Sequence, residues 1–290
     1  QRHGHLERVS DDLRPHVVAS AAAGQAHLID VDAGRARDVE DLAQVEGDAL
    51  HHRARHVADL VLRRKADERR ACLRVVDGHT LACEVRQEQQ AARPGRFEYE
   101  LEAELLHEFR RGGAQFPAYW PIVASGANAC VLHYVSNDAA LRDGDLVLID
   151  AGCELAGYAS DITRTFPVGR RYSAAQRAVY EIVLAAQAAA IAKIRAGNAW
   201  NEPHDAAVRV LAQGMLDLKL VSGSLDEVLE KETYKRFYMH RTGHWLGMDV
   251  HDAGDYKRAG KWRTLAPGMV LTVEPGLYIR AADDVPEALR

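Results

Sequence analysis

Two aspartates in the stretch LIDAGCELAGYASDITRTF, residues 148–166, are the first residues whose type and spacing suggest chemistry. Folded as a hairpin about a turn at residues 154–157, this stretch places Asp150 opposite Asp161. Like charges that face each other in a sheet repel, unless they share a proton or a cation. Because carboxylate oxygens suit Mn, Mg or Zn, one interpretation is a divalent metal site. The alternative is a surface hairpin that carries two solvated acids.

Three histidines lie close together in MHRTGHWLGMDVHD, residues 239–252. His240 and His244 are four residues apart, but the glutamate of an HExxH zinc motif is absent and two glycines disfavour a regular helix. We therefore expect a loop followed by a strand, with one or two of the imidazoles of His240, His244 and His251 directed into a site. Purely structural histidines are the alternative.

Two further residues fit a site only weakly by themselves. Glu274 follows an apolar run and precedes Pro-Gly in LTVEPGLYI, a position where acidic residues often serve only as turn formers. His133 lies in the apolar run ACVLHY, where an imidazole is more often a hydrogen-bonded core group than a catalyst. Neither residue predicts a site without the others.

A framework of helices and strands must position these side chains. Apolar residues at helical spacing around residues 101–109 predict a helix that ends at Gly112. Ser173 and Gln176 form a capping box for a helix that extends to about residue 196, and a further helix is expected over 202–220. The stretches after the turn at residue 143 and after the Pro-Gly at 267–268 read as strands. We expect an α+β fold in which helices cover one face of an antiparallel sheet.

The composition changes near residue 95. Every Phe, Tyr, Trp, Met and Asn of the 290-residue chain lies beyond residue 96, so the first third has little large apolar surface to bury. We interpret residues 1–94 as a separate segment, poorly ordered or translated in a shifted frame, and residues 95–290 as the folded domain. The net charge of -5 gives no indication of nucleic-acid binding, and no apolar run is long enough to cross a membrane. Four scattered cysteines without a CxxC pair suggest reduced thiols in a cytoplasmic protein.

Residues 95–290 resemble the pita-bread metallopeptidases, and within them the aminopeptidase P and prolidase branch. The resemblance is carried by LHY, GDLVLIDAGCELAGYASDITRTFPV, HRTGHWLGMDVHD and LAPGMVLTVEPGLYI, in the order and spacing of the family. It implies a dinuclear site with four ligands: Asp150, Asp161, His244 and Glu274. It also implies three imidazoles that bind substrate: His133, His240 and His251.

The mechanism that the resemblance implies is hydrolysis by a water held between two metal ions. Asp161 would bridge both ions, and Glu274 would accept the proton of the water, whose hydroxide attacks the scissile carbonyl. His133 and His251 would support the carbonyl oxygen and the leaving prolyl nitrogen. The ions are most often Mn²⁺ in this branch, and Co²⁺ or Zn²⁺ occurs among relatives.

The implied activity is the release of the N-terminal residue from peptides that carry proline in second position. A prolidase that cleaves only Xaa-Pro dipeptides is the alternative with the same class of function. An inactive pita-bread fragment that binds peptides is the alternative from another class of function. The implied partners are peptides with an Xaa-Pro N-terminus. A homo-oligomer is left open.

The chain departs from the family pattern near its last residues. The family supplies a fifth ligand, a bridging glutamate on the strand that returns after VEPGLYI, and the segment DDVPEALR offers only Glu287 in the connecting turn. We therefore expect a pita-bread fold that is incomplete at its C-terminal end. Weaker metal binding and an exposed apolar edge along residues 269–279 are the expected consequences.

Overall fold

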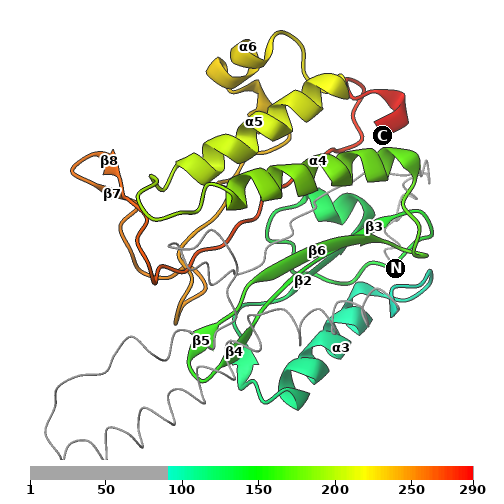
Figure 1. Ribbon diagram of the computed structural model, residues 1–290. Coiled ribbons are helices and arrows are strands. Elements are labelled where there is room, and N and C mark those ends of the chain that lie inside the picture. Colours follow the sequence, from blue (N-terminus) through cyan, green and yellow to red (C-terminus); the bar gives the residue numbers. More distant parts are fainter. Residues whose placement is uncertain (1–90, 290) are drawn as a thin grey trace, which may run out of the picture.

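The computed structural model describes residues 91–289, and Figure 1 labels its elements. The prediction for residues 1–94 thus lies outside the described residues except at its last four positions, among which Ala92 is buried in the core under α3. The elements follow in chain order: α3 (Glu98–Arg111), β1 (Phe116–Pro117), β2 (Ile122–Ser125), η2 (Gly126–Cys130), β3 (Leu146–Ala151), β4 (Cys153–Leu155), β5 (Tyr158–Ala159), β6 (Ile162–Pro167), α4 (Ala174–Ile191), α5 (Glu202–Asp217), α6 (Leu225–Glu230), η3 (Thr233–Arg236), β7 (Lys257–Arg258), β8 (Lys261–Trp262) and η4 (Glu287–Leu289).

An antiparallel sheet of three strands, in the order β2-β3-β6, lies at the centre of the fold. Alternation along β3 directs Val147 and Ile149 toward α3, where they join Leu101 and Leu105 in one apolar core. Asp150 follows Ile149 and therefore points to the opposite face. Figure 1 shows α3 below the sheet, so α3 covers one face. The face of Asp150 is turned toward α4 and the last part of the chain, where Leu146 joins the core of α4 and α5, so helices lie on both sides of the sheet and not on one side as predicted.

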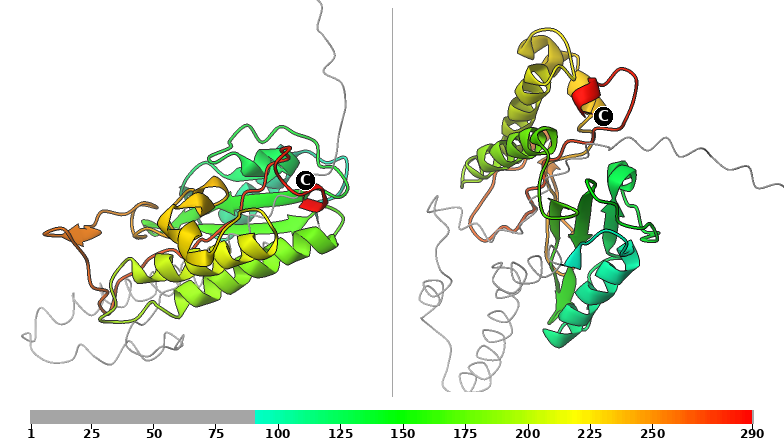
Figure 2. Two further views of the ribbon diagram at one scale, coloured as in Figure 1. Left: turned by 90° about the horizontal axis from the view of Figure 1, so that it is seen from above. Right: turned by 90° about the vertical axis from the view of Figure 1, so that its right-hand side faces the viewer.

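A second core lies between α4, α5 and the last third of the described chain. In Figure 1 the two helices run side by side above the sheet, and the orange and red chain passes behind them, as the view from above in Figure 2 also shows. Buried residues of α4 and α5, among them Val183 and Leu211, pack in one cluster with Leu271, Val273 and Leu277. This packing fixes the segment that carries Glu274.

Helix α3 ends at Arg111, next to the predicted stop at Gly112, whereas α4 and α5 begin where predicted and end slightly earlier. Ser173 accepts the backbone N–H of Gln176, which completes the predicted capping box of α4. The helix stops at Ile191 instead of about residue 196, because the chain turns away to donate the Gly197 N–H to the Leu265 carbonyl. Helix α5 ends at Asp217. No helix between residues 91 and 289 has the length and apolarity to span a membrane.

The strand predicted for residues 269–279 is not formed as a regular strand. The segment runs antiparallel to residues 237–246 through single hydrogen bonds, from the N–H groups of Thr272, Glu274 and Tyr278, and one isolated bridge at Leu271. The side chains of Leu271, Val273, Leu277 and Ile279 lie in the core under α4 and α5. The predicted exposed edge concerns the backbone on the side away from residues 237–246 and stays a prediction. Burial against helices stabilises this extended chain without a ladder on both sides.

Candidate metal centre and active-site pocket

The hairpin that carries the two aspartates has a register two residues away from the one expected. Asp150 pairs with Thr163, and Leu155 pairs with Tyr158 around a two-residue turn. Ala156 and Gly157 both have positive φ, 53° and 81°, as a type I′ turn requires. The expected four-residue turn, and with it the direct opposition of Asp150 to Asp161, is therefore wrong.

The two aspartates nevertheless lie on one face, as diagonal neighbours. A shift of two residues keeps the side-chain alternation, so Asp161 faces the same side as Asp150. Regular pairing stops between them at Gly152, where a Cβ atom would lie 1.8 Å from the carbonyl oxygen of Ser160. Only glycine tolerates this approach, and the missing side chain leaves the face open between the two carboxylates.

Tyr119 joins the two carboxylates. Its hydroxyl oxygen lies 2.6 Å from Oδ1 of Asp150 and 3.1 Å from Oδ1 of Asp161. One O–H group can donate to only one of them, so a proton or a cation must relieve the other contact. Burial and the charge of Asp161 raise the pKa of Asp150 to about 8, although the hydrogen bond from Tyr119 lowers it. The pair therefore carries the electrostatic conflict that the sequence suggested.

His244 stands between two carboxylates. Its Nε2 lies 3.1 Å from Oδ2 of Asp161 and 3.2 Å from Oε1 of Glu274, and its Nδ1 lies 2.9 Å from the carbonyl oxygen of Trp245. Burial lowers the pKa of His244, but the hydrogen bonds to Asp161 and Glu274 outweigh it and raise the pKa to about 10. With Nδ1–H donated to the backbone, the Nε2 lone pair of the neutral ring is free to bind a cation.

Thr272 and Gly243 hold His244 next to Glu274. The Thr272 hydroxyl accepts the N–H of His244 at 3.0 Å and donates to Oε1 of Glu274 at 2.6 Å. At Gly243 a Cβ atom would lie 2.0 Å from the Thr272 carbonyl oxygen, so the two segments meet at backbone contact. The irregular segment thus depends on one hydroxyl and one glycine to position two site residues.

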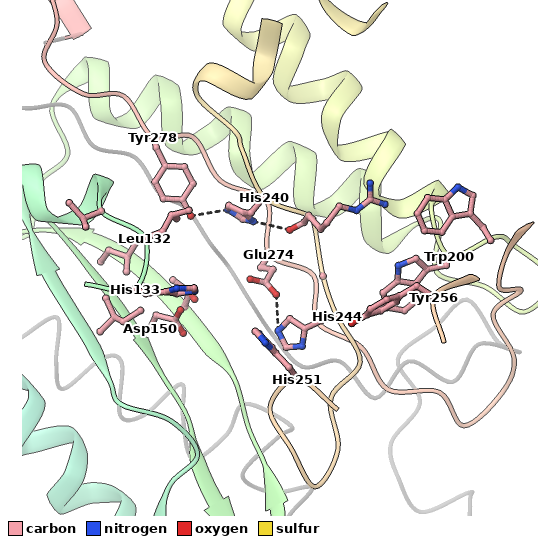
Figure 3. A pocket seen from close by; sticks show the side chains of 17 residues that line it. Leu132, His133, Asp150, Trp200, His240, His244, His251, Tyr256, Glu274 and Tyr278 are labelled. Carbon is pink, nitrogen blue, oxygen red and sulfur yellow. Dashed lines mark hydrogen bonds and ion pairs between the residues drawn. The ribbon is translucent and has the colours of Figure 1, made fainter. Parts of the chain in front are cut away.

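Figure 3 shows the side chains that line a pocket of about 600 Å³, among them Asp150, His244 and Glu274. His133 lies near Asp150, and His240 forms a 2.9 Å hydrogen bond with the hydroxyl of Tyr278. The ring of His251 meets that of His244 edge-on, with 4.2 Å between the centroids. All three imidazoles that the sequence analysis selected therefore line one pocket, together with Trp200, Tyr256 and Trp262.

The predicted ligands come together in part. Asp161, His244 and Glu274 each offer one ligand atom, and these atoms lie within 4.8 Å of one another. Asp150 lines the pocket but stands outside that group, linked to it through Tyr119. Carboxylate and imidazole donors suit Mn²⁺, Co²⁺ and Zn²⁺, and the protons that Asp150 and His244 retain mark the places where a cation would replace them. The residues therefore fit a divalent metal.

Sequence reasoning missed Tyr119, Thr272 and Tyr278. Thr272 is two residues before Glu274, and strand alternation could have placed the two side chains on one face. Tyr278 could have been found in the same way, four residues after Glu274. Tyr119 lies in the loop PAYWP, where no periodicity indicates which side chain points inward.

Comparisons with known proteins agree with this geometry. The sequence profile of metallopeptidase family M24 matches residues 68–287. The Xaa-Pro aminopeptidase of Haemophilus influenzae is 55% identical over 198 residues, which are 68% of this chain and 46% of that protein. The structure of Pseudomonas aeruginosa aminopeptidase PepP shares 56% identity with a TM-score of 0.71, over 73% of this chain and 48% of that one.

A third relative is Zn-substituted Escherichia coli aminopeptidase P in complex with product, at 48% identity and a TM-score of 0.70, over 73% of this chain and 48% of that one. The chain spans about half the length of the relatives it matches. Over the matched part it has their α+β pita-bread fold, which confirms the predicted fold class. The profile match covers most of the chain, and the chain therefore belongs to metallopeptidase family M24.

Proposed function

We propose that this chain carries the centre of a metal-dependent Xaa-Pro aminopeptidase, which releases the N-terminal residue from peptides with proline in second position. The observation that carries the proposal is the convergence of Asp161, His244 and Glu274 at the edge of a pocket lined by further imidazoles. The Haemophilus influenzae relative bears the name of this activity.

We propose that the site holds two divalent ions and that these are Mn²⁺, with Co²⁺ or Zn²⁺ as alternatives. Four residues of this chain would hold them: Asp150, Asp161, His244 and Glu274. When bound, such a pair of ions lowers the pKa of a water between them and polarises the scissile carbonyl. Asp161 is suited to bridge the ions because its two oxygens face different ligands. Its Oδ2 contacts His244, and its Oδ1 contacts the hydroxyl of Tyr119, which also binds Asp150. Tyr119 and Thr272 fix the orientation of the carboxylates.

The catalytic roles that we propose fall to Glu274, His133 and His251. Glu274 accepts the proton of the attacking water, and the Thr272 hydroxyl holds Oε1 so that one carboxylate oxygen keeps a fixed direction. His133 and His251 donate to the carbonyl oxygen and to the prolyl nitrogen, and His240 with its Tyr278 partner binds the substrate beside them. The bond before proline lacks an N–H group, so recognition through imidazoles and metal suits it.

Activity measured on two substrates tests the proposal against its alternatives. The purified chain is loaded with Mn²⁺ and given an Xaa-Pro dipeptide and an Xaa-Pro-Xaa tripeptide of the same first residue. An aminopeptidase cleaves the tripeptide, whereas a prolidase cleaves only the dipeptide. Glu274→Gln is the matched negative control. Peptide binding without cleavage, and without about two metal ions per chain, would favour the inactive peptide-binding fragment instead.

We further propose a cytoplasmic location, with peptides as the partners and neither nucleic acid nor membrane among them. Cys130 and Cys153 are buried thiols that form no disulfide within the described part of the chain, which supports a reducing compartment. Light scattering of the purified chain would test whether it forms a homo-oligomer, which stays an open prediction.

A further inference from the structure

The loop of residues 125–139 carries His133 into the pocket, and most of its middle is exposed. Val131 and Leu132 line the pocket with His133, and their exposed fractions are 53% and 44%. Apolar burial therefore does little to fix these three residues. Some other interaction must hold the imidazole at the pocket wall.

Backbone geometry shows that the loop is under constraint. His133 and Asn137 have φ angles of 56° and 47°, the left-handed region that few residues other than glycine adopt, although His and Asn enter it more readily than most. Residues stay in such conformations only where the surrounding contacts determine them fully. The contacts that hold both ends of the loop are therefore part of what positions His133.

Glu98, the first residue of α3, binds both ends of this loop through one buried carboxylate, and we call these hydrogen bonds the Glu98 clamp. The residue is fully buried. Oε1 accepts the N–H and the hydroxyl of Ser125 at 2.6 and 2.7 Å and the amide of Asn128 at 3.3 Å. Oε2 accepts the hydroxyl of Tyr134 at 2.8 Å and the N–H of Ala139 at 3.0 Å. Oε1 thus holds the start of the loop, and Oε2 holds its end.

The partners of Glu98 are all neutral donors, so the carboxylate acts as an acceptor on both sides. A second clamp supports it: the side chain of Asn137 accepts the Val123 N–H at 3.0 Å and donates to the Pro121 carbonyl and to Glu102, both at 2.9 Å. Glu98 is distant in sequence from every group it binds and belongs to none of the predicted ligands. Its side-chain hydrogen bonds all go to the 125–139 loop, which carries His133.

We propose that Glu98 is a positioning residue, which holds His133 at the pocket wall by fastening the two ends of the 125–139 loop to α3. The proposal rests on the proposed function only for the role of His133. The fastening itself is a property of the loop and can be measured without turnover.

Glu98→Gln is the decisive variant because no orientation of the new amide preserves the clamp. Each carboxylate oxygen accepts a backbone N–H, from Ser125 on one side and Ala139 on the other. Whichever way the glutamine turns, its NH₂ group faces one of these donors, and that end of the loop loses its side-chain acceptor. The hydrogen bond from the Glu98 N–H to the Ala139 carbonyl and the pairing of Ser125 with Val147 remain. Glu102→Gln is the matched control, one helical turn away, because glutamine can still accept from Asn137 with its carbonyl oxygen.

Hydrogen exchange of the backbone amides tests the clamp in the purified full chain. We expect exchange at residues 125–139 to become at least about tenfold faster in Glu98→Gln, with β3 and α4 unchanged and Glu102→Gln like the parent. Tyr134→Phe removes one donor of the clamp at a half-buried position and should accelerate the same amides to a smaller extent. If Glu98→Gln fails to fold, Tyr134→Phe decides. Unchanged exchange in the loop would overturn the proposal.

A double-mutant cycle with His133→Ala tests whether the clamp acts through the imidazole. In the Mn²⁺-loaded chain, Glu98→Gln and Tyr134→Phe should each lower kcat/KM for the tripeptide, and the loss should disappear when His133 is already alanine. Equal losses in both backgrounds would overturn the link to His133. If the chain has no peptidase activity, calorimetric binding of the tripeptide replaces kcat/KM in the same cycle, so the failure of the proposed function and that of the clamp are told apart.

Discussion

The site joins two regions that position their side chains in different ways. The hairpin of β3 and β6 sets Asp150 and Asp161 by a ladder of backbone pairs, from Leu146 with Pro167 to Ala151 with Ile162. The extended segments 237–246 and 269–279 set His244 and Glu274 with scattered hydrogen bonds and a single bridge. Regular pairing distributes the task over many backbone groups, whereas the irregular region concentrates it on a few. The two halves should therefore respond differently to small changes.

The largest effects are expected at the two glycines that allow backbone contact. Gly152→Ala places a methyl group 1.8 Å from the Ser160 carbonyl oxygen, and Gly243→Ala places one 2.0 Å from that of Thr272. Neither neighbour is a flexible side-chain end, so the backbone must move, and we expect each variant to lose about 3–5 kcal/mol of unfolding free energy. Chemical denaturation measures both.

Two other glycines provide matched controls. Gly157 lies in the hairpin turn and Gly268 in the turn before the irregular segment, both with φ of 81° and with no atom within 4 Å of an added Cβ. Alanine there should cost only about 1–2 kcal/mol, the strain of the left-handed backbone. If Gly243→Ala were no worse than Gly268→Ala, the irregular region would be loose enough to absorb the methyl group, and the contrast with the hairpin would be lost.

Asp161→Asn removes the charge at the point where the two regions meet. Asp161 contacts His244 from the second region and Tyr119 beside the first. We expect Mn²⁺ affinity, measured by calorimetry, to fall at least about 100-fold, because the amide is a poor bridging ligand. Glu154→Gln, on the same hairpin but away from the pocket, should leave the affinity unchanged. An unaltered affinity in Asp161→Asn would remove this residue from the metal site.

Added metal should counteract the pH dependence of stability that the metal-free chain shows. Folding raises the pKa of Asp150 from 3.8 to about 8 and that of His244 from 6.5 to about 10, so the folded chain holds protons that the unfolded chain releases. The unfolding free energy of the metal-free chain should therefore fall as pH rises through these windows. Each kcal/mol that is lost should lower Tm by about 2–4 °C. Because metal binds the deprotonated ligands, Mn²⁺ should stabilise more at pH 9 than at pH 6.

Asp150→Asn isolates one of these two contributions. The variant should remove the metal-free dependence between about pH 4 and pH 6.5, where Asp150 titrates alone, and reduce it between pH 6.5 and 8, where the two windows overlap. It should keep the part from pH 6.5 to 10 that belongs to His244. A metal-free Tm that rises with pH would contradict the assigned protonation of both groups.

The contrast between the regular hairpin and the irregular segments also explains how far the sequence predicts each of them. The hairpin could be predicted, because strand alternation places both aspartates on one face whichever even shift the register takes. The shift of two residues escaped prediction because Ala156-Gly157 lacks the Asn-Gly or Asp-Gly signal of a type I′ turn. Pattern thus determined the face, and turn geometry determined the pairing.

The irregular region could be predicted only as a set of residues. The resemblance to the family implied His244 and Glu274 as ligands, and the structure places them side by side, but the expected strand at 269–279 is wrong. What holds these residues is the approach of Gly243 to Thr272, 29 positions later in the chain, and the burial of apolar residues under α4 and α5. Local periodicity carries no information about such a contact, because it depends on how distant segments pack.

The smallest effects, and the sharpest comparison, are expected from removing one hydroxyl on each side. Tyr119→Phe deletes the group that joins Asp150 to Asp161, and Thr272→Val deletes the group that joins His244 to Glu274. Partners of this kind change metal affinity by about 10–100-fold. We expect Tyr119→Phe near the lower end, since the ladder still holds the strands of the hairpin, and Thr272→Val near the upper end.

The difference between these two variants follows from what each hydroxyl does for the backbone. Thr272 also accepts the His244 N–H, so valine leaves a backbone donor without its partner as well as freeing a carboxylate. Tyr119 binds only side chains through its hydroxyl, and phenylalanine preserves its packing. Calorimetry with Mn²⁺ on both variants gives the comparison directly. A larger loss in Tyr119→Phe would mean that the carboxylates of the hairpin, and not the segments around His244, are the part of the site that depends on a single contact.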